Sequence, residues 1–160
     1  MKKVLVSACL LGDRVRYDGQ GKWIDHPVLA RWLREGRVVK VCPEVAGGLG
    51  IPRPPAERRG AHVVTNGGED VTKAFEFGAA IALKLVQEHG VTVAVLKENS
   101  PSCGSSAIND GTFTKTRIAG AGVTTELLRR HGVKVFSELE LEEANNSLSS
   151  EEERVGVRSN

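Results

Sequence analysis

Segments with the pattern of buried β-strands alternate with helix-like segments along most of this chain. Short runs of β-branched and apolar residues occupy positions 4–6, 38–41, 91–96 and 133–136, and helix-like runs separate most of them. Such alternation is typical of βαβ units, in which parallel strands form a sheet that helices cover. The sequence therefore predicts an α/β fold: a Rossmann-like three-layer domain with a mainly parallel sheet and a site at the C-terminal ends of its strands.

Three helices are predicted from the spacing of apolar residues and from their end signals. The first begins at Pro27, a residue type favoured in the first helical turn, and ends before Gly36. The second covers residues 71–89, where a narrow polar stripe leaves the other positions apolar, and the third covers about residues 122–131. The strand at 91–96 is apolar on both faces, which places it in the middle of the sheet.

The connections between these elements include two long loops, at residues 43–60 and 97–118. The first contains too many glycines and prolines for regular structure, and loops of this length in a small domain are usually functional. A short edge strand is expected at 61–65. Residues 143–160 are rich in Asn, Ser and Glu and contain too little apolar surface to order themselves. We therefore expect one domain over residues 1–142, followed by a flexible tail.

Composition and charge exclude several classes of protein. The 22 Lys and Arg residues nearly balance 20 Asp and Glu residues, and the net charge of +2 gives no strong signal for nucleic acid or an anionic membrane. No apolar run approaches the roughly 20 residues that span a bilayer, and the N-terminus lacks the pattern of a secretory signal. We expect a cytoplasmic protein that acts on a small molecule. The sequence leaves its oligomeric state undetermined.

Three cysteines, Cys9, Cys42 and Cys103, lie at or just beyond the ends of three strand-like runs. Loops that follow the carboxyl ends of parallel strands form the ligand crevice of an open α/β sheet, so the three thiols are expected to meet there. In a reducing compartment they are metal ligands, nucleophiles or buried thiols rather than disulfides. Three thiolates that leave one coordination position open suit a metal ion or an iron–sulfur cluster, and simple packing of free cysteines is the alternative.

Several blocks of sequence within residues 4–136 together resemble one known family. The blocks are Ser7-Ala8-Cys9-Leu10-Leu11-Gly12, Val15-Arg16-Tyr17-Asp18-Gly19, Cys42-Pro43-Glu44, Gly47-Gly48-Leu49, Pro52-Arg53-Pro54-Pro55, Lys97, Ser100-Pro101-Ser102-Cys103-Gly104 and Asp110-Gly111-Thr112-Phe113. In this order and spacing they resemble the 2-thiouracil desulfidase family, a group of small desulfurases formerly catalogued as a domain of unknown function. Val15 stands where some relatives carry a further cysteine.

The resemblance implies a [4Fe-4S] cluster held by Cys9, Cys42 and Cys103, with one iron that has no protein ligand and binds the sulfur of the substrate. It also implies that Glu44 and Ser100 are the catalytic acid and hydroxyl. Soft thiocarbonyl sulfur binds sulfur-rich iron better than a carbonyl oxygen does. The expected reaction is a non-redox hydrolysis of C=S to C=O in a thiolated pyrimidine or a related thioamide, in which Glu44 activates water and Ser100 assists proton transfer.

Four further residues are candidates for contact with the substrate: Tyr17, Asp18, Arg53 and Lys97. Tyr17 and Asp18 can stack on and hydrogen-bond a pyrimidine, although Asp18 followed by glycine is equally a turn signal. Arg53 and two nearby arginines can shape the pocket or bind a phosphate, or they form a solvated basic loop. Lys97 either faces the crevice or anchors a carboxylate.

Other interpretations of the candidate site remain open at this point. Glu44 is also consistent with a loop or capping carboxylate, and Ser100 with a cap on the turn before Pro101. Two other functions use the same cysteines: a sulfur-transfer or thiolation enzyme that delivers hydrosulfide from the open iron, and a non-catalytic metal or redox sensor. A proton-transfer pair beside the metal favours catalysis over sensing, and the lack of a P-loop weakens ATP-activated thiolation.

Overall fold

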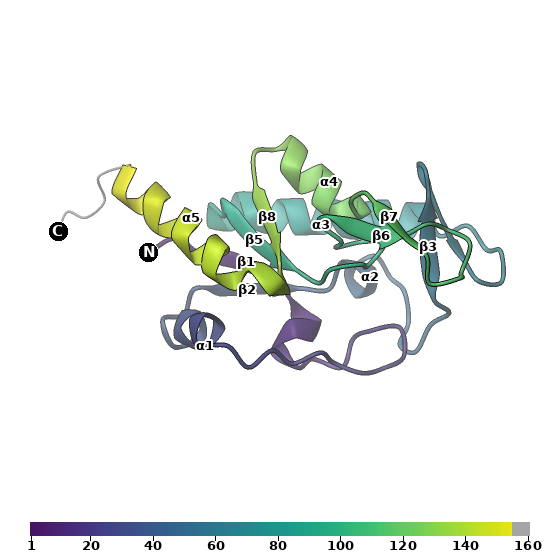
Figure 1. The fold of residues 1–160 in the computed structure, drawn as a ribbon, viewed down its shortest axis with the longest axis horizontal. Helices are drawn as coiled ribbons and strands as arrows, with labels where there is room; N and C mark the ends of the chain where they lie inside the picture. Colours follow the sequence, from purple (N-terminus) through teal and green to yellow (C-terminus); the bar gives the residue numbers. More distant parts are fainter. Residues whose placement is uncertain (155–160) are drawn as a thin grey trace.

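The fold was obtained as a computed structural model, which describes residues 1–154 and centres on a four-stranded parallel sheet (Figure 1). Its strands lie in the order β2-β1-β5-β8, and every neighbouring pair is parallel. They are β1 (Val4–Ser7), β2 (Val38–Val41), β5 (Val93–Leu96) and β8 (Lys134–Ser137). The α/β prediction is therefore confirmed, and the predicted strand ends differ from these by at most two residues.

Helices cover both faces of the sheet and complete the three layers. The helices are α1 (Pro27–Arg34) and α5 (Leu141–Arg154) on one face, and α3 (Thr72–His89) and α4 (Val123–Arg130) on the other. Side chains of β1 alternate between two cores, since Val4 and Val6 belong to the core under α1 and α5 whereas Leu5 belongs to the opposite one. None of the helices within residues 1–154 has the length and apolar character needed to cross a membrane.

The strand order creates a crevice at the carboxyl ends of the strands. From β1 the chain passes through α1 to β2 on one side, and then through α3 to β5 on the other side of β1. Open α/β sheets bind ligands outside the carboxyl ends of their strands, where the order reverses in this way. Here the reversal lies between β1 and β5, which precede Cys9 and the loop that carries Cys103.

Two antiparallel hairpins and one short helix occupy the loops near this crevice. They are β3 (Ala56–Arg59) with β4 (His62–Thr65), β6 (Ala107–Asn109) with β7 (Arg117–Ala119), and α2 (Pro43–Ala46). The edge strand predicted at 61–65 is confirmed as β4, but the prediction that residues 43–60 lack regular structure is wrong. The prolines allow both elements, because Pro43 occupies the first turn of α2, where its fixed φ suits a helix, and β3 begins only after Pro55.

The prediction of a flexible tail from residue 143 is wrong for the part of the chain that the structure describes. Residues up to Arg154 form α5, in which Leu141, Ala144 and Leu148 are at most 3% exposed. Their spacing puts these three side chains on one helical face, which packs on α1 and on the sheet. A low apolar content is sufficient because the apolar residues share that face. Residues 155–160 lie outside the described residues.

Candidate active site

A cavity of about 600 Å³ opens at the carboxyl ends of the parallel strands. All three cysteines line it, since Cys9 follows β1, Cys42 follows β2 and Cys103 lies in the loop after β5. All three are free thiols, and Cys9 and Cys103 are buried. The structure thus brings together three residues that are far apart in sequence, as their positions after strands led us to expect.

Short helical turns present the first two thiols to the cavity. Cys9 lies in the 3-10 helix η1 (Ala8–Leu11), which directly follows β1. Cys42 is the residue before α2, and α2 packs so closely on α3 that a Cβ at Gly78 would overlap the carbonyl oxygen of Pro43. The position of Cys42 therefore depends on a glycine in a helix that is distant in sequence.

Cys103 is held by hydrogen bonds from within its loop and from α4. Its backbone N–H donates to Ser100 Oγ at 3.1 Å, and its carbonyl accepts a hydrogen bond from Thr125 Oγ1 at 2.9 Å. Ser100 Oγ also accepts the N–H of Ser102 at 3.1 Å. Because both lone pairs of the Ser100 hydroxyl are then used, its own proton is free to be donated into the cavity, which Ser100 lines. Ser100 therefore both caps a turn and faces the cavity.

The surroundings of the thiols keep them protonated when no metal is bound. Burial raises the pKa of Cys9 to about 11 and that of Cys103 to about 12, and it also raises the pKa of Cys42. The nearby Cys42 raises the pKa of Cys9 further, so these two sulfurs interact electrostatically. Protonated thiols are poor nucleophiles, but a metal that binds the thiolate form displaces their protons into solvent.

The donor set suits a sulfur-bridged cluster better than a single metal ion. Within residues 1–154, no three His, Cys, Asp or Glu side chains come close enough to hold one ion. The three thiols reach one cavity from separate elements. This arrangement is compatible with a four-iron cluster, because its irons occupy separate corners of a cube and each takes its own thiolate.

Glu44 lines the cavity from the first turn of α2, two residues after Cys42. Its Oε1 accepts a hydrogen bond from Arg53 Nε at 2.9 Å, and the side chain of Arg53 is only 7% exposed. The guanidinium also donates to the carbonyl oxygens of Val15 at 2.9 Å and Gly50 at 3.0 Å. Arg53 therefore lines the cavity as a buried group that orients Glu44.

Of the other three candidates for substrate contact, two line the cavity and one does not. Tyr17 and Lys97 line the cavity. Asp18 is not among its lining residues, and its Oδ1 accepts the N–H of Gln20 at 3.0 Å, which favours the turn interpretation. Lys97 Nζ forms an ion pair with Glu138 Oε2 at 3.1 Å. Lys97 thus faces the crevice and also anchors a carboxylate.

Of the two arginines that follow Arg53, Arg58 is half-buried and Arg59 is exposed, and both make hydrogen bonds to carbonyl oxygens. Arg58 donates hydrogen bonds to the carbonyl oxygens of Gly60 at 2.8 Å and Ala121 at 2.7 Å. Arg59 donates to the carbonyl oxygen of Gly111 at 2.8 Å. Both side chains therefore tie the β3–β4 hairpin to neighbouring loops.

Three carboxylates that the sequence did not single out order the loops around the cavity. Glu57 in β3 is buried and accepts the N–H groups of Gly111 and Phe113 at 2.9 and 3.1 Å. Glu98 and Glu138 organise the loop after β5. A signal existed for Glu98, which lies two residues beyond the most apolar strand, at the edge of the sheet where functional residues gather. Glu57 lies in a segment that was predicted to be irregular, and it had no such signal.

Comparison with known proteins places the chain in a family. The family described as 2-thiouracil desulfurase matches residues 4–140. The uncharacterized protein YbbK of Bacillus subtilis (strain 168) is 42% identical over 148 residues, which cover 86% of this chain and 97% of that protein. A solved structure of the [4Fe-4S]-dependent thiouracil desulfidase TudS is 56% identical, with a TM-score of 0.92 over 93% of this chain and 99% of that one. This chain therefore belongs to the 2-thiouracil desulfurase family.

Proposed function

We propose that this chain is a [4Fe-4S]-dependent desulfidase, which hydrolyses the C=S bond of a thiolated pyrimidine such as 2-thiouracil to C=O and releases sulfide. The observation that carries the proposal is the placement of three free thiols in one cavity together with Glu44 and Ser100. Membership of the desulfurase family and the likeness to a solved desulfidase support the same activity. The reaction adds water and releases hydrogen sulfide, so it consumes no electrons.

Cys9, Cys42 and Cys103 would hold the cluster in this cavity. When bound, the cluster would supply Lewis-acid chemistry at an iron without a protein ligand, for which soft thiocarbonyl sulfur is a better partner than a carbonyl oxygen. Because the thiols are protonated without metal, loading releases protons and becomes less favourable at low pH. The burial of Cys9 and Cys103 limits the access of water to their sulfur atoms.

Glu44 is the group that we assign as the base for the attacking water. Arg53 fixes Oε1 of its carboxylate at 2.9 Å. Among the residues that the structure describes, none donates a hydrogen bond to Oε2, which leaves this atom for a water molecule in the cavity. General acid–base catalysis of this kind typically contributes about 10²- to 10⁴-fold to the rate.

Ser100 is the group that we assign as a proton donor. Its oxygen accepts the N–H groups of Ser102 and Cys103, so the hydroxyl acts as a donor toward the cavity. The receiving atom would be the leaving sulfur or a ring nitrogen of the substrate. The turn that positions the ligand Cys103 therefore also positions the hydroxyl proton of Ser100.

Tyr17, Phe113 and Lys97 line the same cavity and are suited to a planar heterocycle. Aromatic rings provide flat apolar surface, and a charged donor can orient a polar edge of the substrate. Lys97 remains tied to Glu138 at 3.1 Å, so its ammonium group is held in place before the substrate arrives. We assign these three residues to substrate binding rather than to proton transfer.

Anaerobic reconstitution tests the proposal. The protein is loaded with iron and sulfide, its absorption spectrum is recorded, and uracil and sulfide are assayed after addition of 2-thiouracil. We expect a coloured protein that forms both products in equal amounts without added reductant or ATP. A colourless protein that prefers zinc, or an intact cluster that releases no sulfide, would contradict the proposal.

Variants separate the roles of the site residues. Cys42→Ala should lose the cluster and its colour, whereas Glu44→Gln should keep the colour and lose about 10²- to 10⁴-fold in kcat. Glu76→Gln, at an exposed position of α3, is the matched control and should keep both. If Glu44→Gln retains full activity, Glu44 is not the base.

A further inference from the structure

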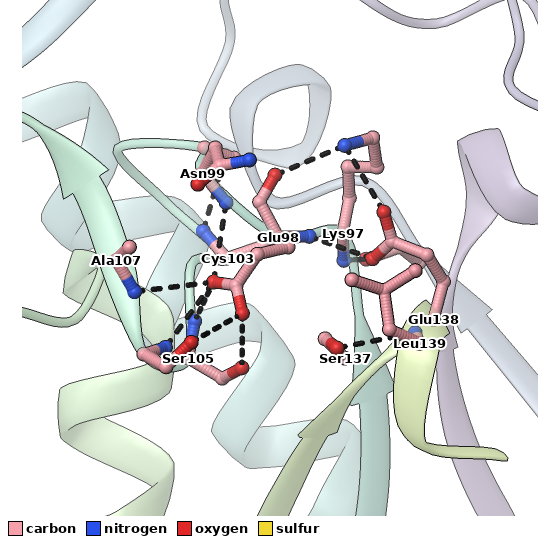
Figure 2. Close-up of polar contacts among 12 residues, drawn as sticks. Lys97, Glu98, Asn99, Cys103, Ser105, Ala107, Ser137, Glu138 and Leu139 are labelled. Atoms are coloured by element: carbon pink, nitrogen blue, oxygen red, sulfur yellow. Dashed lines mark hydrogen bonds and ion pairs between the residues drawn. The ribbon is translucent and has the colours of Figure 1, made fainter. Parts of the chain in front are cut away.

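The loop between β5 and β6, residues 97–106, carries Ser100 and Cys103 but contains no helix or strand. Its backbone N–H groups must therefore find partners outside regular secondary structure. Several of them converge on one side chain, the carboxylate of Glu98 (Figure 2). This convergence points to a function of Glu98 in shaping the loop.

The carboxylate of Glu98 is surrounded by donors. The residue is 8% exposed and accepts six hydrogen bonds on its side chain. Oε2 accepts the hydroxyl groups of Ser105 at 3.1 Å and Ser106 at 2.7 Å. Oε1 accepts four backbone N–H groups, those of Asn99 at 3.2 Å, Ser105 at 2.8 Å, Ser106 at 3.1 Å and Ala107 at 3.4 Å.

These hydrogen bonds join the two ends of one segment. Asn99 lies at its start and Ser105 to Ala107 at its end, with Ser100 and Cys103 between them. Inside the segment, the N–H of Cys103 donates to Ser100 Oγ at 3.1 Å. We propose that Glu98 is a positioning residue for the desulfidase reaction proposed above, because it closes the loop that presents Ser100 and Cys103 to the cavity.

A second carboxylate holds the start of the same loop. Glu138, in η2 (Glu138–Glu140), accepts the backbone N–H of Glu98 on Oε1 at 2.8 Å and pairs with Lys97 through Oε2 at 3.1 Å. Lys97 Nζ also donates to the carbonyl oxygen of Glu98 at 3.0 Å. The backbone of Glu98 is thereby attached to the end of β8, so its side chain closes the loop from a fixed point.

The charge of Glu98 is essential to this closure. Burial by itself raises the pKa of Glu98, but hydrogen bonds from Ser106, Ser105 and Asn99 outweigh it and hold the pKa at about 2. Both oxygens therefore act as acceptors near neutral pH. A glutamine at this position carries no charge, and its NH₂ group cannot accept the hydroxyl protons of Ser105 and Ser106 as Oε2 does. Glu98→Gln thus preserves the shape of the side chain but replaces charge-assisted hydrogen bonds by weaker neutral ones, which loosens the closure.

Glu152→Gln provides a matched control. Glu152 in α5 is half-buried, accepts the backbone N–H of Lys2 at 3.0 Å and pairs with Arg37 at 3.1 Å, yet it does not line the cavity. Both variants therefore remove a carboxylate that binds a backbone donor. Only Glu98→Gln is expected to affect the loop of Ser100 and Cys103.

The first measurement uses the metal-free protein, alkylated with iodoacetamide and analysed by mass spectrometry. Glu98→Gln should raise the alkylation rate of Cys103 by about tenfold or more, the effect of losing a hydrogen bond to a charged group. The rate at Cys9 should stay close to that of the wild type, and Glu152→Gln should change neither rate. This measurement reports the position of the loop without any turnover.

The second measurement uses the reconstituted protein and separates kcat from KM. Since Ser100 is assigned to proton transfer, Glu98→Gln should lower kcat by about tenfold or more and leave KM nearly unchanged. Loss of cluster colour to an iron chelator should also be faster. The proposal is overturned if Glu98→Gln keeps both the Cys103 alkylation rate and the kcat of the wild type. It is also overturned if Glu152→Gln, with the same Tm as Glu98→Gln, loses as much kcat.

Two further outcomes are decided by the same assays. If Glu98→Gln does not fold, Ser106→Ala removes one donor to Oε2 and should raise alkylation of Cys103 by a smaller factor; an unchanged rate overturns the proposal. If the wild type releases no sulfide from 2-thiouracil, the proposed function fails. The alkylation of Cys103 then still decides whether Glu98 holds the loop.

Discussion

Gly78 is the point at which α3 touches α2, the short helix that carries Glu44. A Cβ built on Gly78 would overlap the carbonyl oxygen of Pro43 and lie 2.7 Å from its carbonyl carbon. On the other side of the contact, a Cβ on Gly47 would overlap the carbonyl oxygen of Ala74. Both obstacles are backbone atoms, so no side chain can rotate away to make room for a methyl group.

Gly78→Ala therefore sets two effects against each other. Alanine stabilises a helix interior by about 1 kcal/mol relative to glycine. An extra methyl group in a tightly packed contact costs about 1–3 kcal/mol. Because the overlap here is with backbone, we take the upper end and expect a net loss of about 2 kcal/mol in the free energy of unfolding. In a domain of this size, such a loss lowers Tm by about 4–8 °C.

Thermal and urea unfolding of the metal-free protein measures this loss, and Ala80→Gly in the same helix is the control. Ala80 is exposed, so its replacement reports helix propensity alone, a loss of about 1 kcal/mol. Separation of α2 from α3 also moves Glu44, so Gly78→Ala should lower kcat after reconstitution, whereas Ala80→Gly should not. A higher Tm for Gly78→Ala, as propensity alone would produce, refutes the reasoning.

Two further predictions concern α5 and the loop of Glu98. Leu148→Ala removes a side chain that is 1% exposed and should lower the free energy of unfolding by about 2–5 kcal/mol in urea; a change under about 0.5 kcal/mol would show that α5 is not docked. The pKa of Glu98 is lowered from 4.5 to about 2, so its stabilising effect is complete above pH 4.5 and is lost as the pH falls toward 2. Between these pH values the free energy of unfolding of Glu98→Gln should change less steeply with pH than that of the wild type. Parallel curves of free energy against pH would show that the pKa of Glu98 is not lowered by folding.

Local patterns were sufficient to predict the sheet and most of its helices. Runs of β-branched residues and the amphipathic spacing of helices are signals that involve only a few neighbouring residues. The four parallel strands and α1, α3 and α4 were therefore predicted within two residues of their ends. The convergence of Cys9, Cys42 and Cys103 followed from the same patterns, because parallel strands end on one edge of a sheet.

The predictions failed where contacts distant in sequence decide the local structure. The C-terminal segment has little apolar surface, but Leu141, Ala144 and Leu148 are enough to order it because α1 and the sheet offer a matching face. Likewise, the segment of β3 is rich in charged residues and forms a strand through its pairing with β4. Neither partner surface can be recognised from the residues of the segment itself.

The sequence by itself determined the class of fold, the resemblance to a family and the three thiols that share one cavity with Glu44 and Ser100. Only the tertiary structure decided which of the surrounding polar groups are free to act. Arg53 is committed to Glu44, Asp18 to a turn and Glu98 to the loop of Cys103. The physical reason is that hydrogen-bond partners are selected by distance in space, and a partner can lie on any segment that the fold brings near.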